Sequence, residues 1–199
     1  MLLSRVGTGD GGVALTAAVS TADAKAHLNI YHATDDDLIA GFVAVAQQHL
    51  EGEDGLGGVL GRAIVRHTLD LALPLFPSSR VIELPQPPLV SVTHVKYIDA
   101  DGDEQTLSSS AYAVHADRTG GYVKLKPDES WPITEMGIDD AVRVRFVCGY
   151  DAVPGPLKSA ILLHVGHLYL NREATGAATA VLPLAWKALT DPYKTHGWI

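Results

Sequence analysis

The stretch Leu89–Arg172 decides the fold through three segments that fall in it or overlap its ends. PPLVSVTHVKYIDADGDE (87–104) is rich in β-branched residues up to an Asp-Gly pair, which is typical of a strand that enters a hairpin turn. AVRVRFVCGYDAVP (141–154) places Arg143 and Arg145 between apolar residues, as expected of a half-buried antiparallel strand. PLKSAILLHVGHLYLNRE (156–173) begins with a proline and predicts a helix. Its inward residues are expected to be Leu157, Ala160, Ile161, His164 and Leu168.

The residues before this stretch predict three helices. Ser20 with Asp23 forms a capping pattern for a helix that ends near Asn29, and Thr34 with Asp37 repeats the pattern for a second helix. The apolar stripe of the second helix is Leu38, Ile39, Phe42, Val43, Ala46 and Leu50. A third helix is predicted from Leu56, Leu60, Ile64 and Leu71, and Pro74 ends it.

After Pro77 the pattern changes to short strands. The predicted strands are Val81–Leu84, Leu89–Ile98, Tyr112–His115, Gly121–Lys126 and Ala141–Cys148. The fold class is therefore α+β: a helical bundle with an inserted small antiparallel β section and a C-terminal helical tail. The predicted organisation is a flexible N-terminal arm (1–19), a main domain (20–174) and a C-terminal tail (175–199). The main domain comprises helices in 20–73, the β section in 80–149 and a helix in 155–172.

Composition excludes several classes of protein. The formal net charge is −8, and neutralising phosphates requires Lys and Arg, so direct nucleic-acid binding is not expected. The one cysteine, Cys148, lies in an apolar strand and predicts a buried, inert thiol. The N-terminus lacks the apolar core of a signal peptide, and no apolar run is long enough for a membrane span. We expect a soluble protein.

Several motifs resemble binding or catalytic sites, but each has a simpler structural interpretation. GTGDGG (7–12) has only a few residues before it and no second strand after it, unlike a dinucleotide site, and DADGDE (99–104) lacks the spacing of a calcium loop. His164 and His167 are predicted as a core histidine and its surface neighbour. Asp35–Asp37 fit a helix start, and Ser108–Ser110 have no nucleophile elbow. No catalytic residue, cofactor or metal is expected, so the chain is not predicted to be an enzyme.

In their order along the chain, several segments resemble the head–tail connector (adaptor) proteins of long-tailed phages and gene transfer agents. The resemblance is to the branch with a β section inserted among the helices, and it covers about Ser20 to Lys194. The segments are TADAKAHLNI, DDDLIAGFVAVAQQHLE, LGRAIVRHTLDL, IELPQPPLVSVTHVKYIDADG, YAV, WP at Trp131-Pro132, AVRVRFVCGYDAVPGPLKSAILLHVGHLYLNRE and LP…LTDPYK.

The resemblance implies a structural subunit of a ring, expected to be dodecameric. The ring would join the portal protein to a stopper or tail-terminator protein and extend the channel through which DNA passes without specific binding. The expected location is the neck of a virion or phage-like particle, with the host cytoplasm before assembly and no membrane contact. The particle is an infectious phage, a defective prophage or a gene transfer agent.

Two sets of residues are candidates for this role. An aromatic and apolar C-terminal set is expected to dock onto the portal, since such side chains are favoured binding anchors. An acidic set is expected to line the channel, because a basic wall would bind DNA. The docking set is Leu184, Trp186, Leu189, Tyr193 and Trp198; the acidic set is Glu51, Glu53, Asp54, Asp99, Asp101, Asp103 and Glu104.

Two other functions remain as alternatives at the level of sequence. One is a small-ligand or metal-binding α+β domain without catalysis, which would use His164, His167 and the acidic turn. The other is a hydrolase with an unrecognised site.

Overall fold

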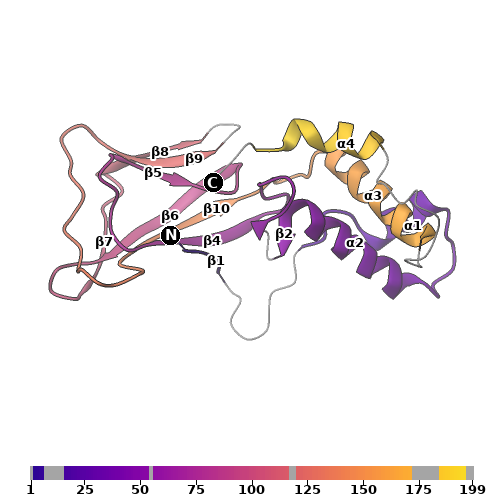
Figure 1. The fold of residues 1–199 in the computed structure, drawn as a ribbon, viewed down its shortest axis with the longest axis horizontal. Helices are drawn as coiled ribbons and strands as arrows, with labels where there is room; N and C mark the ends of the chain where they lie inside the picture. Colours follow the sequence, from indigo (N-terminus) through magenta and orange to yellow (C-terminus); the bar gives the residue numbers. More distant parts are fainter. Residues whose placement is uncertain (1, 7–15, 54–55, 117–119, 172–183, 196–199) are drawn as a thin grey trace. The chain divides into compact units, whose positions relative to one another are not determined.

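The computed structural model describes residues 2–6, 16–53, 56–116, 120–171 and 184–195 (Figure 1). The chain divides into two compact units, which are described one at a time. The β unit comprises Met1–Val13 and Arg66–Gly149, and the helical unit comprises Ala14–Val65 and Tyr150–Ile199. Because a run of strands interrupts the helical part of the chain, the predicted α+β class with an inserted antiparallel β section is confirmed.

Two antiparallel sheets form the β unit (Figure 1). The larger sheet contains, in spatial order, β1 (Leu2–Arg5), β4 (His67–Leu73), β10 (Val142–Cys148), β6 (Leu89–Ile98) and β7 (Glu104–Thr106). The smaller sheet contains β5 (Val81–Leu84), β9 (Gly121–Leu125) and β8 (Tyr112–Ala116). The five strands predicted from the sequence are all present, and the turn at Asp101-Gly102 joins β6 to β7 as predicted.

The alternating pattern of β10 gives this unit its core. Val142, Val144, Phe146 and Cys148 have no exposed surface, so the thiol is buried as predicted. On the other face, Arg145 lies opposite Asp70 of β4. Its Nε and Nη2 atoms donate to the two carboxylate oxygens of Asp70 over 2.8 and 2.7 Å. This bidentate cross-strand pair fixes the register of β4 against β10.

The predicted third helix, marked by Leu56, Leu60, Ile64 and Leu71, is wrong. Residues 67–73 form the strand β4, in which buried Leu69 and Leu71 alternate with half-buried Thr68 and Asp70. This period of two matches a strand, whereas the helical prediction counted only the leucines and Ile64.

The prediction of a flexible arm over 1–19 is also wrong in part. Residues 2–5 form the edge strand β1, in which Leu3 pairs with Leu71 of β4. Ala18 and Val19 are 7% and 3% exposed in the core of the helical unit. Their apolar side chains gain more from burial than the chain loses in conformational freedom. GTGDGG at 7–12 lies outside the described residues.

The helical unit contains four α-helices in the described ranges. They are α1 (Thr21–Leu28), α2 (Asp36–Glu51), α3 (Gly155–Leu170) and α4 (Leu184–Thr190), with the 3-10 turn η1 (Asp191–Tyr193) and the short pair β2 (Gly52–Glu53) and β3 (Leu56–Gly57). Ser20 caps α1 as predicted, because its Oγ accepts the backbone N–H of Asp23 over 3.1 Å. The predicted Thr34 cap is wrong: the N-cap of α2 is Asp35, and its side chain makes no capping hydrogen bond. The three adjacent carboxylates already oppose the helix dipole there.

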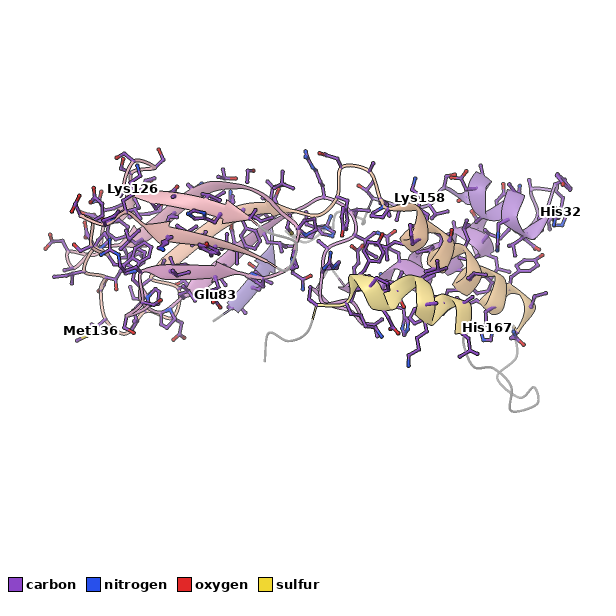
Figure 2. All side chains as sticks on the ribbon, turned by 90° about the horizontal axis from the view of Figure 1, so that it is seen from above. His32, Glu83, Lys126, Met136, Lys158 and His167 are labelled. Carbon is purple, nitrogen blue, oxygen red and sulfur yellow. The ribbon has the colours of Figure 1, made fainter. Side chains whose placement is uncertain are left out.

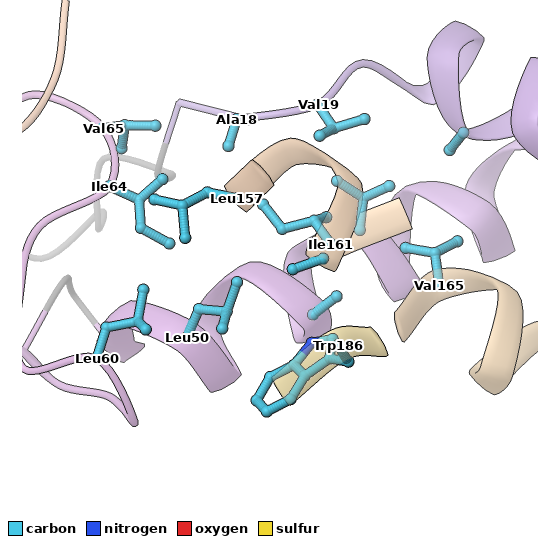
Figure 3. Close-up of a cluster of buried hydrophobic side chains, with 14 of the residues drawn as sticks. Ala18, Val19, Leu50, Leu60, Ile64, Val65, Leu157, Ile161, Val165 and Trp186 are labelled. Carbon is cyan, nitrogen blue, oxygen red and sulfur yellow. The ribbon is translucent and has the colours of Figure 1, made fainter. Parts of the chain in front are cut away.

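The core of the helical unit gathers side chains from all four helices and from the segments between them (Figure 3). Leu157 and Ile161 of α3 have no exposed surface and lie between Ala18 and Val19 on one side and Trp186 on the other (Figure 3). This arrangement corrects the predicted division of the chain. The described part of the predicted tail is not separate, because residues 184–193 pack into the helical unit. The predicted linker TGAATA at 175–180 lies outside the described residues.

Each helix in the described ranges falls short of the length and apolarity that a membrane span requires.

Candidate functional site

The turn between β6 and β7 carries the acidic residues predicted for the channel wall. Asp101, Asp103 and Glu104 are exposed, and Asp99 is half-buried. The backbone N–H groups of Asp101 and Asp103 donate to Oδ1 of Asp99 over 3.1 and 3.0 Å. The Gln105 side chain donates to Oδ2 of Asp99 over 2.8 Å. The Asp99 carboxylate therefore orders its own turn, as Asx turns do, instead of facing outward for a ligand.

Two carboxylates of this turn are held in their charged form. The backbone hydrogen bond from Asp103, and next the Gln105 side chain, lower the pKa of Asp99. The hydrogen bond from Lys96 lowers the pKa of Glu104, whose Oε1 lies 2.6 Å from Lys96 Nζ. Hydrogen bonds to the ionised form stabilise it. The turn thus presents permanent negative charge on the β unit near neutral pH.

Glu51, also predicted for the channel wall, is buried with no exposed surface at the end of α2, so this prediction is wrong. Its Oε2 accepts the backbone N–H of Ile64 over 2.7 Å, and its Oε1 accepts the Gln47 side-chain amide over 2.6 Å. Gln47 in turn accepts the N–H of Ala18 over 2.8 Å. These bonds fasten two connecting segments to α2. The Glu53 side chain and Asp54 lie outside what the structure describes.

Most of the predicted docking set lies in the core instead of on the surface. Trp186 is 6% exposed, and Leu189 and Tyr193 pack partly buried against the core cluster. These three residues are therefore not exposed binding anchors, because the short amphipathic helix buries its apolar face against neighbouring segments. Leu184 is 90% exposed and remains a candidate. Trp198 lies outside the described residues.

Three aromatic rings link α4 to the rest of the unit. The ring centroid of His49 on α2 lies 5.1 Å from that of His164 on α3 and 5.6 Å from that of Trp186. His164 is 7% exposed, as the core interpretation predicted. Burial, and next the charges of His49 and His167, lower its pKa from 6.5 to about 4. His164 is therefore neutral at physiological pH and acts as a packing residue.

His164 and His167 do not form part of a metal site within the described ranges. His167 is half-buried near the end of α3 (Figure 2), where the Asn171 side chain donates to its backbone carbonyl over 2.8 Å. Among described residues, no group of three or more His, Cys, Asp or Glu side chains is placed to hold a metal ion.

A groove on the helical unit is the surface feature that sequence reasoning missed. It has a volume of about 230 Å³ and lies between α2 and the segment that precedes α1. Its walls are mostly small and apolar, with two glutamines at one end. The lining residues are Ala17, Val19, Thr21, Ala40, Val43, Ala44, Gln47 and Gln48. The one available signal was Gln47, a polar residue one turn after Val43 on a face that was otherwise apolar.

The fold was compared with those of known proteins. No protein-family model and no curated protein matches the sequence. A chain of the virion of a native gene transfer agent (GTA) particle superposes with a TM-score of 0.77 at 21% identity, over 100% of this chain and 98% of that one. This chain has the fold of a GTA virion protein.

Two further GTA structures match over the same shares of both chains. One is the neck of an empty GTA particle computed with C6 symmetry, with a TM-score of 0.74 at 20% identity. The other is the neck of a native GTA particle computed with C12 symmetry, with a TM-score of 0.70 at 21% identity. The GTA neck fold therefore includes both units of this chain, the strands as well as the helices. This agrees with the resemblance read from the sequence.

Proposed function

We propose that this chain is a structural head–tail connector (adaptor) subunit in the neck of a phage-like particle. Copies of the chain form a ring, with twelve subunits expected, that joins the portal to a stopper or tail-terminator protein. The ring extends the channel for DNA and performs no catalysis. The observation that carries the proposal is the full-length likeness to chains of GTA necks and virions.

The chemistry of the described surfaces supports this role. A closed ring of identical subunits needs two different faces on each subunit. The helical unit offers such faces, because it has a groove and also a strongly exposed leucine. The acidic turn of the β unit and the net charge of −8 suit a wall past which DNA slides.

The alternative of a metal-binding domain has little support. His164 is buried beside Trp186, and Asp99 accepts hydrogen bonds from its own turn. Neither group is available to a ligand in this arrangement.

Removing the chain from cells that produce the particle tests the proposal. We expect DNA-filled heads and free tails that fail to join, and antibody against the chain should label the head–tail joint of wild-type particles. Electron microscopy provides both measurements. Normal tailed particles without the chain, or label elsewhere on the particle, would contradict the proposed function.

The charge of the β6–β7 turn gives a second test. Asp101→Lys with Asp103→Lys should slow DNA release from particles, because added lysines bind phosphates and displace counterions. The effect should weaken as salt is added. The matched control is Glu83→Lys with Asp128→Lys, which makes the same charge change at exposed positions outside the turn. Equal rates of DNA release from both variants would show that this turn does not line the channel.

A further inference from the structure

We propose that the groove beside α2 is the socket for Leu184 of a neighbouring copy of the chain. This inference rests on the proposed function, because it names the contact that closes the ring. The groove and Leu184 would form one repeated head-to-tail contact within the helical units.

The groove is suited to an aliphatic side chain from a helix. Alanines 17, 40 and 44 and the valines 19 and 43 form most of its walls. Alanine walls allow the backbone of a second helix to approach closely. At one end Gln47 is tied to Ala18 and to the Thr16 carbonyl, over 2.8 and 3.0 Å. The socket is therefore held open by hydrogen bonds that are already satisfied within the unit.

Leu184 has the surroundings of an inserting side chain. At 90% exposure it is the most exposed large apolar side chain described in the helical unit. It begins α4, where Ala185 and Ala188 are also exposed, while Trp186 points into the core. The outward face of α4 therefore carries Leu184 beside the small residues Ala185 and Ala188 and the exposed Lys187. Leu184 is the large apolar side chain that this face offers to a groove lined by alanines, and the long side chain of Lys187 can extend its charged end into solvent.

The socket and the leucine lie on opposite flanks of the same unit. His49 of α2 contacts Trp186 of α4, so this side of α2 faces α4. Ala40 precedes His49 by nine residues, which is two and a half helical turns, and therefore points the opposite way. Leu184 therefore cannot enter the groove of its own chain. Two complementary surfaces on opposite flanks generate a heterologous contact, and such contacts build rings.

A second copy is therefore the favoured occupant over the portal or another partner. Two of the solved neighbours are necks computed with C6 and C12 symmetry, in which identical chains repeat around an axis. A leucine and a groove that are complementary and lie on different faces of one chain match that kind of repetition. A portal contact would not require both surfaces on one chain.

Disulfide trapping tests this contact. The variant carries Ala44→Cys and Leu184→Cys, and the single native cysteine, Cys148, is buried in the β unit. Under oxidation, in particle-producing cells and in concentrated purified protein, we expect a ladder of covalent dimers, trimers and larger species. A mixture of the two single variants should give dimers only. The matched control is Ala26→Cys with Leu184→Cys, since Ala26 is equally an exposed alanine on a helix but lies outside the groove, and it should give no ladder.

Several outcomes would overturn the contact. Dimers of the Ala44→Cys variant alone would indicate a symmetric pairing of grooves. A cross-link from Leu184→Cys to the portal, or a double variant that stays monomeric in particles, would assign Leu184 elsewhere.

Localisation separates this failure from failure of the proposed function. If antibody still labels the neck while no ladder forms, the connector role stands and the contact is wrong. If the chain is absent from the neck, the proposed function itself fails.

Discussion

At the scale of single residues, Glu51 has the largest structural role among the acidic candidates. Its carboxylate accepts hydrogen bonds from Gln47 and from the Ile64 backbone in a site without exposed surface. A buried donor that loses its acceptor costs more than the hydrogen bond itself contributed. One acidic side chain thus holds the C-terminal end of α2 to the segment that leads into the β unit.

Glu51→Ala should destabilise the helical unit by about 2 kcal/mol or more, because it leaves the Ile64 N–H and the Gln47 amide with unmet hydrogen-bonding capacity. Urea unfolding followed by circular dichroism measures the loss. Glu104→Ala is the control: Glu104 is exposed and pairs with Lys96 at the surface, so its removal should leave stability unchanged within error. Equal effects of both changes would contradict the buried role of Glu51.

His164 should make the stability of the helical unit depend on pH. Its pKa is about 4 when folded and near 6.5 when unfolded. Between these values the unfolded chain binds more protons, so the free energy of unfolding falls as pH is lowered. The shift corresponds to a loss of about 3 kcal/mol, complete near the lower pKa. Unfolding in urea at a series of pH values measures it.

His164→Leu should flatten this part of the pH dependence, since the proton-binding group is gone. His32→Leu is the control in the same unit, and it should keep the wild-type profile because the His32 side chain is exposed and does not contribute to the pKa shift of His164. If the free energy of unfolding of His164→Leu falls with pH as steeply as that of the wild type, other groups cause the acid sensitivity.

At the scale of elements, glycines decide how closely connecting segments approach the helices. A Cβ atom at Gly58 would collide with the backbone at the end of α2, from Leu50 to Gly52. Backbone atoms cannot move aside as the end of a side chain can. By contrast, a Cβ at Gly41 on α2 would meet nothing within 4 Å.

Gly58→Ala should therefore destabilise the chain by about 2 kcal/mol or more through overpacking. Gly41→Ala should stabilise it by about 0.5–1 kcal/mol, because alanine loses less conformational entropy in a helix. Thermal unfolding of the two variants measures both effects, and the opposite signs are the expected result. Two changes of the same sign would contradict the close approach at Gly58.

The sequence predicted elements best where one periodicity stood alone. The alternation around Arg143 and Arg145 gave β10 and its buried face, and Ser20 with Asp23 gave the start of α1. It predicted β4 badly, because of the residues counted for a helix only Leu71 lies in β4, and the alternation of Leu69 and Leu71 with Thr68 and Asp70 was not used. It also predicted Trp186 as a docking residue: an aromatic on a short terminal helix has the same local pattern whether the helix packs on its own chain or on a partner.

At the scale of the whole molecule, the class of fold and its resemblance could be predicted from the residues, but the interaction surfaces could not. The groove combines Ala17 with Ala40 and Val43, which no local pattern connects. Such a surface exists only after tertiary packing. The exposed or buried state of Glu51 has the same origin, since its partner Ile64 is thirteen residues away in sequence.

The isolated chain should be mainly monomeric at micromolar concentration. The proposed ring contact uses one leucine and a small groove, so it buries too little apolar surface for a stable assembly in dilute solution. Light scattering or native mass spectrometry should give the mass of one chain, 21.1 kDa. A stable dodecamer without the other neck proteins would mean a much larger interface than the one proposed.

The inserted β unit has a consequence for how its gene segment can be exchanged. The chain leaves the helical unit after Val65 and returns at Tyr150, whose backbone N–H donates to the Ile64 carbonyl over 3.4 Å. The two ends of the insertion therefore adjoin, and recombination could replace it as a cassette while the helices persist. Strand β1, however, is separated from the insertion by α1 and α2 in the sequence, and it pairs with β4 at the edge of the sheet. A cassette moved alone would leave its new β4 beside a foreign β1, so the codons for β1 and those for the distant insertion are expected to vary together.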